Sequence, residues 1–174
     1  MDSTVWVAVF TGGTAVLAGW VTSQGNTRAA RVQAEASERA QYRLQLRETR
    51  RAAYLALIER AHIIAELYWR LGGVDVQVSD PNERLIRLDA LRAELRNAFD
   101  PLMRDARVVA LEGPTPVAQA GEALLEAATD ANRELWNVIQ GVPEARIKFD
   151  NAGQEYRAQL ERFIDAARTA MGEL

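Results

Sequence analysis

The feature that most constrains this chain is a long segment near its start that carries no charge. No Asp, Glu, Lys or Arg occurs between Asp2 and Arg28, and residues 4–23 are mainly apolar. A helix that crosses the hydrocarbon core of a bilayer needs about 20 mainly apolar residues, at roughly 1.5 Å per residue. Because the segment has this length, the sequence predicts a transmembrane anchor at residues 1–25.

Two side-chain patterns inside the segment suit a membrane helix. Trp6 and Trp20 stand near its ends, where indole rings favour the headgroup boundary. Small residues recur every three or four positions and therefore share one helix face: Ala8, Gly12, Ala15 and Gly19. Such a face lets two membrane helices approach closely, so we expect the anchor to assemble the chain into a homo-oligomer in the lipid bilayer.

The charges after the segment predict its orientation. Arg28 and Arg31 follow it directly, and no Lys or Arg precedes it. The positive-inside rule then places the N-terminus outside the cell membrane and the rest of the chain in the cytoplasm, as a single-pass protein. Arg28 and Arg31 lie where anionic headgroups attract basic residues, so we expect both at the membrane interface.

Two other interpretations of residues 5–22 stay open. A cleaved signal peptide normally has basic residues before its apolar run, whereas this chain has only Asp2 there. Small residues at Ser23 and Gly25 still suit a cleavage point. The segment is only moderately hydrophobic, because it includes glycines and threonines, so it also suits the buried core of a soluble assembly.

The rest of the chain predicts an all-α fold. Residues 26–52 consist mainly of good helix formers with few large apolar side chains, which predicts a long, basic helical stalk. From residue 53 to residue 174, apolar residues recur at spacings of three and four, in four amphipathic segments joined by short loops. The clearest stripe is Val117, Gly121, Leu124, Ala128, Ala131, Leu135 and Val138. We therefore expect an antiparallel four-helix bundle.

Glycine, proline and capping residues predict where these helices begin and end. Gly72-Gly73 is expected to end the first helix. Asp80, Pro81 and Glu83 form a capping box with proline in the first turn, which predicts the start of the second. Pro101 should kink or break that helix. Thr115, followed by proline, is expected to cap the third.

The sequence contains few residues for catalysis or metal binding. Glu59 and His62 have the Glu-x-x-His spacing of di-metal bundles, but such a site needs two pairs and two further Glu, and the chain has one histidine. We expect His62 to be a hydrogen-bonded residue near the surface, although a metal-binding enzyme that uses His62 stays an alternative. Zero cysteines exclude disulfides and thiolate zinc sites. We predict no catalytic residue, no cofactor and no metal.

The remaining charge and aromatic residues bear on partners. From Glu59 onward there are fourteen basic and twenty acidic residues. No basic patch is interleaved with aromatics there, so we expect no nucleic-acid partner. Trp69 and Trp136 lie near helix ends, where we expect them to cap the bundle core, although a groove for a partner helix or ligand stays an alternative.

The first part of the chain resembles a group of proteins. The stretches "VAVFTGGTAVLAGWVTSQGNTRAARVQAE" and "RETRRAAYLALIERAH" are similar to small actinobacterial proteins with a short N-terminal anchor, an Arg/Ala/Glu-rich helix and a cytoplasmic helical body. The likeness covers roughly the first 70 residues and rests on composition and order. It implies membrane anchoring and helical character, and it supplies no catalytic residues.

Together these patterns favour a non-enzymatic, membrane-anchored helical scaffold or protein-interaction module that binds an unknown protein partner. The alternative is a membrane-active effector that forms a pore or perturbs the bilayer. Thr11 and Thr14, in the middle of the apolar segment, favour that alternative.

Overall fold

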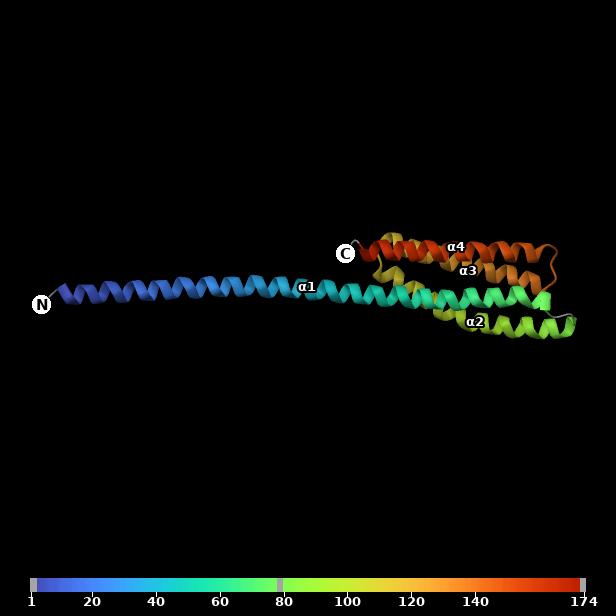
Figure 1. Ribbon diagram of the computed structural model, residues 1–174, viewed down its shortest axis with the longest axis horizontal. Coiled ribbons are helices and arrows are strands. Elements are labelled where there is room, and N and C mark those ends of the chain that lie inside the picture. Colours follow the sequence, from blue (N-terminus) through green and yellow to red (C-terminus); the bar gives the residue numbers. More distant parts are fainter. Residues whose placement is uncertain (1–2, 78–79, 173–174) are drawn as a thin grey trace. The chain divides into compact units, whose positions relative to one another are not determined.

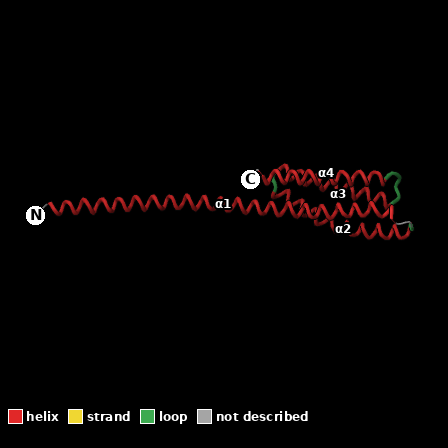
Figure 2. The backbone as a smooth tube through the Cα atoms, in the orientation of Figure 1, coloured by secondary structure: helices red, strands yellow, loops and turns green. Residues whose placement is uncertain are grey.

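The computed structural model is helical throughout the part of the chain that it describes. It describes the backbone of residues 3–77 and 80–172 and the side chains of residues 33–71, 73–74 and 80–172. Its four helices are α1 (Ser3–Gln77), α2 (Pro81–Glu112), α3 (Thr115–Ile139) and α4 (Ala145–Gly172) (Figures 1 and 2). No strand occurs within these bounds, and the prediction of an all-α helical bundle is confirmed.

The chain divides into two compact units, residues 1–46 and residues 47–174. The first unit is the N-terminal part of α1. Its described side chains, residues 33–46, are exposed or half-buried, including the large apolar groups of Tyr42 and Leu44. Glu35 and Arg39 form an ion pair of 3.5 Å along this surface. These features suit a polar helix without a core of its own.

The second unit is the bundle, in which the C-terminal part of α1 packs with the three later helices. The predicted stripe on α3 points inward: its members from Val117 to Leu135 are buried, and Val138 is half-buried. Other fully buried large side chains come from the remaining helices: Leu57, Ile64, Leu102, Val109, Tyr156 and Phe163. The spacing of apolar residues therefore predicted the core-facing side of each helix.

Two buried tyrosines connect the helices by hydrogen bonds as well as by packing. The Tyr156 hydroxyl on α4 donates to the Ala61 carbonyl of α1 at 2.9 Å. The Tyr68 ring on α1 meets the rings of Phe149 and Tyr156 edge-on, with centroids 5.8 and 5.4 Å apart. Edge-to-face pairs of this kind add about 0.5–1.5 kcal/mol beyond the area that they bury. This aromatic layer joins α1 to α4.

The end of α1 differs from the prediction. Gly72-Gly73 does not end the helix, which continues to Gln77. Leu71 and Val74 are both buried in the bundle core, with 2% and 7% of their surface exposed. Because helical geometry across the two glycines brings Val74 into the core, packing outweighs the preference of glycine for a helix end.

The start of α2 is partly as predicted. The Asp80 carboxylate caps α2 by accepting from the Asn82 backbone N–H at 3.0 Å. The Glu83 carboxylate does not complete the expected capping box but accepts from Arg87 one turn later, at 2.6 Å. The helix neither breaks nor restarts at Pro101, which lies inside it.

The start of α3 requires a correction. Thr115 is the first helical residue, and Pro114 occupies the capping position without a side-chain hydrogen bond. The Pro114 carbonyl instead accepts from the backbone N–H groups of Val117 and Ala118, at 2.9 and 3.1 Å. Backbone geometry, not the threonine hydroxyl, therefore begins this helix.

Gly121 offers a test of the core. A methyl group added at its Cα would lie 3.6 Å from Val109, 3.7 Å from Leu57 and 3.8 Å from Phe163, all ordinary contact distances. We expect Gly121→Ala to raise the free energy of unfolding by about 1 kcal/mol, because alanine is the better helix former and the methyl group fits. Gly121→Leu should lower it by about 1–3 kcal/mol through overpacking. Chemical unfolding of the two variants measures both, and a destabilised alanine variant would show that this contact is tighter than the structure has it.

The predicted membrane anchor lies in the part of α1 whose side chains the structure does not describe. Among residues 33–71, 73–74 and 80–172, no helix has a stretch both long enough and apolar enough to cross a bilayer.

Candidate functional site

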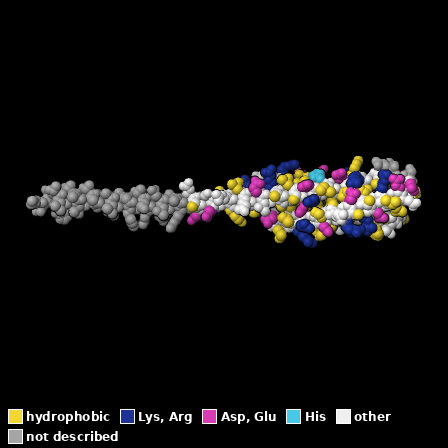
Figure 3. All heavy atoms as spheres, turned by 90° about the horizontal axis from the view of Figure 1, so that it is seen from below, with side chains coloured by type: hydrophobic (Ala, Val, Ile, Leu, Met, Phe, Trp, Pro, Cys, Tyr) yellow, Lys and Arg dark blue, Asp and Glu magenta, His cyan; other side chains and the backbone are white. Residues whose placement is uncertain are grey.

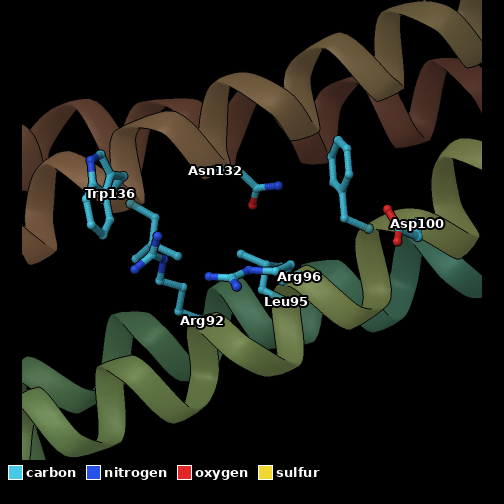
Figure 4. A pocket seen from close by; sticks show the side chains of 8 residues that line it. Arg92, Leu95, Arg96, Asp100, Asn132 and Trp136 are labelled. Carbon is cyan, nitrogen blue, oxygen red and sulfur yellow. The ribbon is translucent and has the colours of Figure 1, made fainter.

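Two surface grooves flank α2 within the bundle, and each has a tryptophan on one wall. The α2–α3 groove has a volume of about 250 Å³ and is lined by Arg92, Leu95, Arg96, Phe99, Asp100, Asn132, Leu135 and Trp136 (Figure 4). The α1–α2 groove has a volume of about 360 Å³ and is lined by Trp69, Arg70, Gly73, Val74, Arg87, Ala90, Leu91 and Glu94. In both grooves an aromatic ring meets basic side chains at a recess of the bundle.

A stacked pair forms one end of the α2–α3 groove. The Arg92 guanidinium lies over the Trp136 ring, 3.8 Å from the ring centroid (Figure 4). The attraction between a cation and the face of an indole contributes about 0.5–1 kcal/mol at an exposed site. Stacking also holds the guanidinium plane in one orientation while its N–H groups stay available at the edge. Arg92 is therefore positioned to bind an anion with little further loss of side-chain freedom.

The floor of this groove is apolar, and one amide stands above it. Leu95 and Leu135 are buried, with 3% and 2% of their surface exposed. The Asn132 side chain reaches the groove from α3, and its Oδ1 accepts from the Tyr68 hydroxyl at 3.0 Å. The same hydroxyl lies 3.0 Å from the Ala128 carbonyl. Tyr68 thereby fixes the Asn132 amide from beneath, with its NH₂ group left to donate elsewhere.

Three charged side chains follow one another along the α2 wall. Arg92, Arg96 and Asp100 are each one helical turn apart, which is roughly 6 Å per step. Figure 4 shows Asp100 at the end of the groove away from Trp136. Neither Arg92 nor Arg96 forms an ion pair with a carboxylate of the described residues. The groove therefore has a cationic end and an anionic end.

The α1–α2 groove differs because its charges are neutralised. Arg70 pairs with Glu94 at 2.9 Å, and Arg87 pairs with Glu83 at 2.6 Å. Its one exposed large apolar side chain among the described residues is Trp69, with 73% of its surface open to solvent. This groove therefore presents an apolar contact surface rather than an ion-binding one.

On the face of the bundle that Figure 3 shows, Arg and Lys side chains are interspersed with Asp and Glu. Several charged side chains of the described bundle form local helix pairs, such as Arg133 with Asp130 at 2.7 Å and Arg168 with Asp165 at 2.9 Å. Such exposed pairs typically contribute under about 1 kcal/mol.

The residues predicted to act in the membrane lie outside the described side chains. They comprise the packing face of the anchor and the interface residues: Ala8, Gly12, Ala15, Gly19, Trp6, Trp20, Arg28 and Arg31. All eight residues lie within the bounds of α1. Their roles in the membrane stay predictions.

His62 lies on the bundle surface. It is exposed, and its Nδ1 lies 2.8 Å from the Ile58 carbonyl, one turn earlier, to which Nδ1–H donates. Within the side chains that the structure describes, no three His, Asp or Glu residues come together in a way that could hold a metal ion. The hydrogen-bonded surface position predicted for His62 is therefore found.

Both bundle tryptophans line grooves, and the expectation that they cap the bundle core is wrong. Trp69 and Trp136 are exposed by 73% and 42% and do not seal the core. Arg92 and Arg96 were not predicted from the sequence as residues of a site. Their four-residue spacing, directly beside the buried Leu91 and Leu95, was a signal that they border the core face of α2.

Comparisons with protein-family models, curated proteins and solved structures found no match to this chain.

Proposed function

We propose that this chain is a non-enzymatic, membrane-anchored module that assembles through its N-terminal segment and binds a partner protein with its helical bundle. Residues 1–25 supply the anchor, on the strength of their length and lack of charge. Residues 47–172 supply the binding surface. The proposal places the bundle on the cytoplasmic face of the cell membrane, because Arg28 and Arg31 follow the anchor.

The observation that carries the proposal is the exposure of large apolar side chains on both sides of α2. Trp69 and Ile86 are exposed by 73% and 69%, and Leu85 and Trp136 by 50% and 42%. Tryptophan is among the residues that contribute most when an interface buries them, and each of the two tryptophans stands beside a groove. The bundle core is closed without them, so their exposure is not required by folding.

A site-specific cross-linker tests the binding surface. We expect a photo-reactive phenylalanine analogue at Ile86 to give a discrete adduct in cells, because the partner covers this position. The same analogue at Ile147 on α4, which is similarly exposed at 64%, is the matched control and should give none. Trp69→Ala should abolish the Ile86 adduct.

The mass of the adduct separates the outcomes. An adduct with a second protein supports the proposal. An adduct with another copy of the chain would mean that the bundle, and not the anchor, mediates self-association. That result contradicts the proposal that the bundle binds a different protein. Equal labelling from Ile86 and Ile147 shows that the patch around α2 is not a specific surface.

Membrane attachment has its own test. After lysis without detergent, we expect the full chain to sediment with membranes and to resist extraction at alkaline pH, because a spanning helix stays in the bilayer. A variant that begins at Asn26 should be released into the supernatant. Recovery of the full chain in the supernatant would contradict the anchor and, with it, the proposed location.

A further inference from the structure

We propose that the α2–α3 groove binds an acidic, amphipathic helical segment of the partner protein, with two carboxylates of that segment on Arg92 and Arg96. This inference rests on the proposed function, because it names the kind of partner that the bundle takes. Its site is distinct from the α1–α2 groove, whose arginines are already paired.

The charge of the groove selects an anion. The chain is acidic from Glu59 onward, yet Arg92 and Arg96 stand together without a carboxylate partner among the described residues. At physiological ionic strength, charges farther than about 8 Å contribute little. The local pair of arginines therefore outweighs the acidic surroundings at close range, and a carboxylate that meets both gains charge-assisted hydrogen bonds.

The size of the groove favours side chains over a small-molecule cofactor. Its volume of about 250 Å³ lies below the range of roughly 300–1,000 Å³ typical of small-molecule sites. Leu95 and Leu135 make its floor apolar, so one or two apolar side chains fit beside the arginines. An anion without an apolar part, such as phosphate, would leave this floor uncovered.

The spacing of the charges favours a helix as the ligand. Arg92, Arg96 and Asp100 repeat every four residues, and a partner helix presents its own side chains at the same repeat of roughly 6 Å. A helix with acidic residues at two successive turns and a basic residue at the third would match the two arginines and Asp100. Grooves between helices commonly take an amphipathic helix in this way.

Tyr68 and Asn132 act as the positioning pair behind this surface. Because the Tyr68 hydroxyl donates to Asn132 Oδ1 at 3.0 Å, the Asn132 NH₂ group is left to donate to a ligand carboxylate or backbone carbonyl. Tyr68→Phe should loosen this amide and weaken the preference for an acidic residue at the position beside it. The apolar contacts of the groove would persist in that variant.

A small set of synthetic helices tests the proposal with the full chain in mild detergent. The probes are fluorescein-labelled amphipathic peptides of one fixed sequence, in which positions i, i+4 and i+8 each carry Glu, Gln or Lys. We expect Glu-Glu-Lys, in one of its two directions, to bind best. Replacing both Glu by Gln should weaken binding by roughly ten- to hundredfold, the effect expected for the loss of two charge-assisted hydrogen bonds.

Variants of the protein assign this preference to the groove. Arg92→Gln/Arg96→Gln should remove the preference for Glu, whereas Arg104→Gln/Arg107→Gln, which makes the same charge change farther along α2, should keep it. Asp100→Arg should shift the preference at the third position from Lys to Glu. Thermal unfolding followed by circular dichroism shows that each variant is folded.

Three results would overturn the inference. They are equal binding of all probes, an unchanged preference in Arg92→Gln/Arg96→Gln, and binding of phosphatidylglycerol vesicles that depends on these arginines while no peptide shows a charge preference. The Ile86 cross-link and the membrane sedimentation are independent of these results. If the cross-link persists and no charge preference is found, only the assignment of the α2–α3 groove fails.

Discussion

Phe163→Ala should lower the free energy of unfolding of the bundle by about 3–5 kcal/mol, the range measured for truncation of a buried aromatic ring. The Phe163 side chain is fully buried on α4 and meets the Tyr54 ring edge-on, with centroids 6.3 Å apart. It also faces Gly121 on α3, where the missing side chain leaves room for the ring. Residues of α1 and α3 therefore pack against this ring of α4.

The loss is large because the neighbours of Phe163 cannot fill the space. Leu57 and Val109 are fully buried and, like Phe163, lie close to Gly121, and moving them would open gaps elsewhere. Phe163→Leu keeps much of the volume and should cost less, about 1–1.5 kcal/mol. The graded series separates lost volume from lost aromatic geometry.

A guanidinium chloride titration of the full chain in mild detergent measures both variants. Ile147→Ala on the same helix is the matched control, because Ile147 is 64% exposed; its effect should stay within about 0.5 kcal/mol. A Phe163→Ala variant as stable as the control would show that α4 does not pack on α1 and α3 as described.

The helices were predictable because the pattern that identifies them is local. The spacing on α3 fixes which side of that helix is buried, and Val117 to Leu135 follow it without exception. Helix ends were less predictable, since they depend on distant packing. The Gly72-Gly73 pair is a good local stop signal, but the helix continues and Val74 is buried in the bundle core, which depends on how the helices pack.

The α2–α3 groove could not be predicted for the same reason. Arg92 lies on α2 and Trp136 on α3, far apart in the sequence. Their side chains stack because the two helices pack in one particular register. The sequence showed that Trp136 lies near a helix end but not which residue faces it. Likewise, the bond from Tyr68 to Asn132 joins α1 to α3 and leaves no trace in local spacing.

Raising the pH from 8 to 11 should destabilise the bundle by about 3 kcal/mol, mainly through two buried tyrosines. Burial raises the pKa of Tyr68 well above its ordinary value, and the neighbouring Tyr156 raises it further. Burial likewise raises the pKa of Tyr156. The Tyr68 hydroxyl also donates a hydrogen bond, to Asn132 Oδ1 or the Ala128 carbonyl, and the Tyr156 hydroxyl donates to the Ala61 carbonyl. A phenolate cannot donate, so ionisation would remove these bonds.

Stability falls with rising pH because the tyrosines ionise at a lower pH in the unfolded chain than in the folded one. A tyrosine in the unfolded chain loses its proton near pH 10, whereas the two buried hydroxyls keep theirs. The stability that they contribute is therefore complete below pH 10 and declines above it, by about 1.4 kcal/mol per pH unit for each tyrosine. Lysine is the other side chain that ordinarily ionises in this range, and the chain has only Lys148.

Tyrosine-to-phenylalanine variants isolate this effect. At pH 8 we expect Tyr68→Phe/Tyr156→Phe to be less stable than the native chain by about 1–3 kcal/mol, because hydrogen bonds are lost. Between pH 10 and 11 the free energy of unfolding of the native chain should fall more steeply than that of the variant, in which burial still raises the pKa of Tyr54, so the two curves converge. Tyr42→Phe, a change at a 68% exposed position, is the control and should follow the native curve. A parallel fall in the double variant would mean that other groups cause the alkaline loss and that the aromatic layer does not hold these hydroxyls in the neutral form.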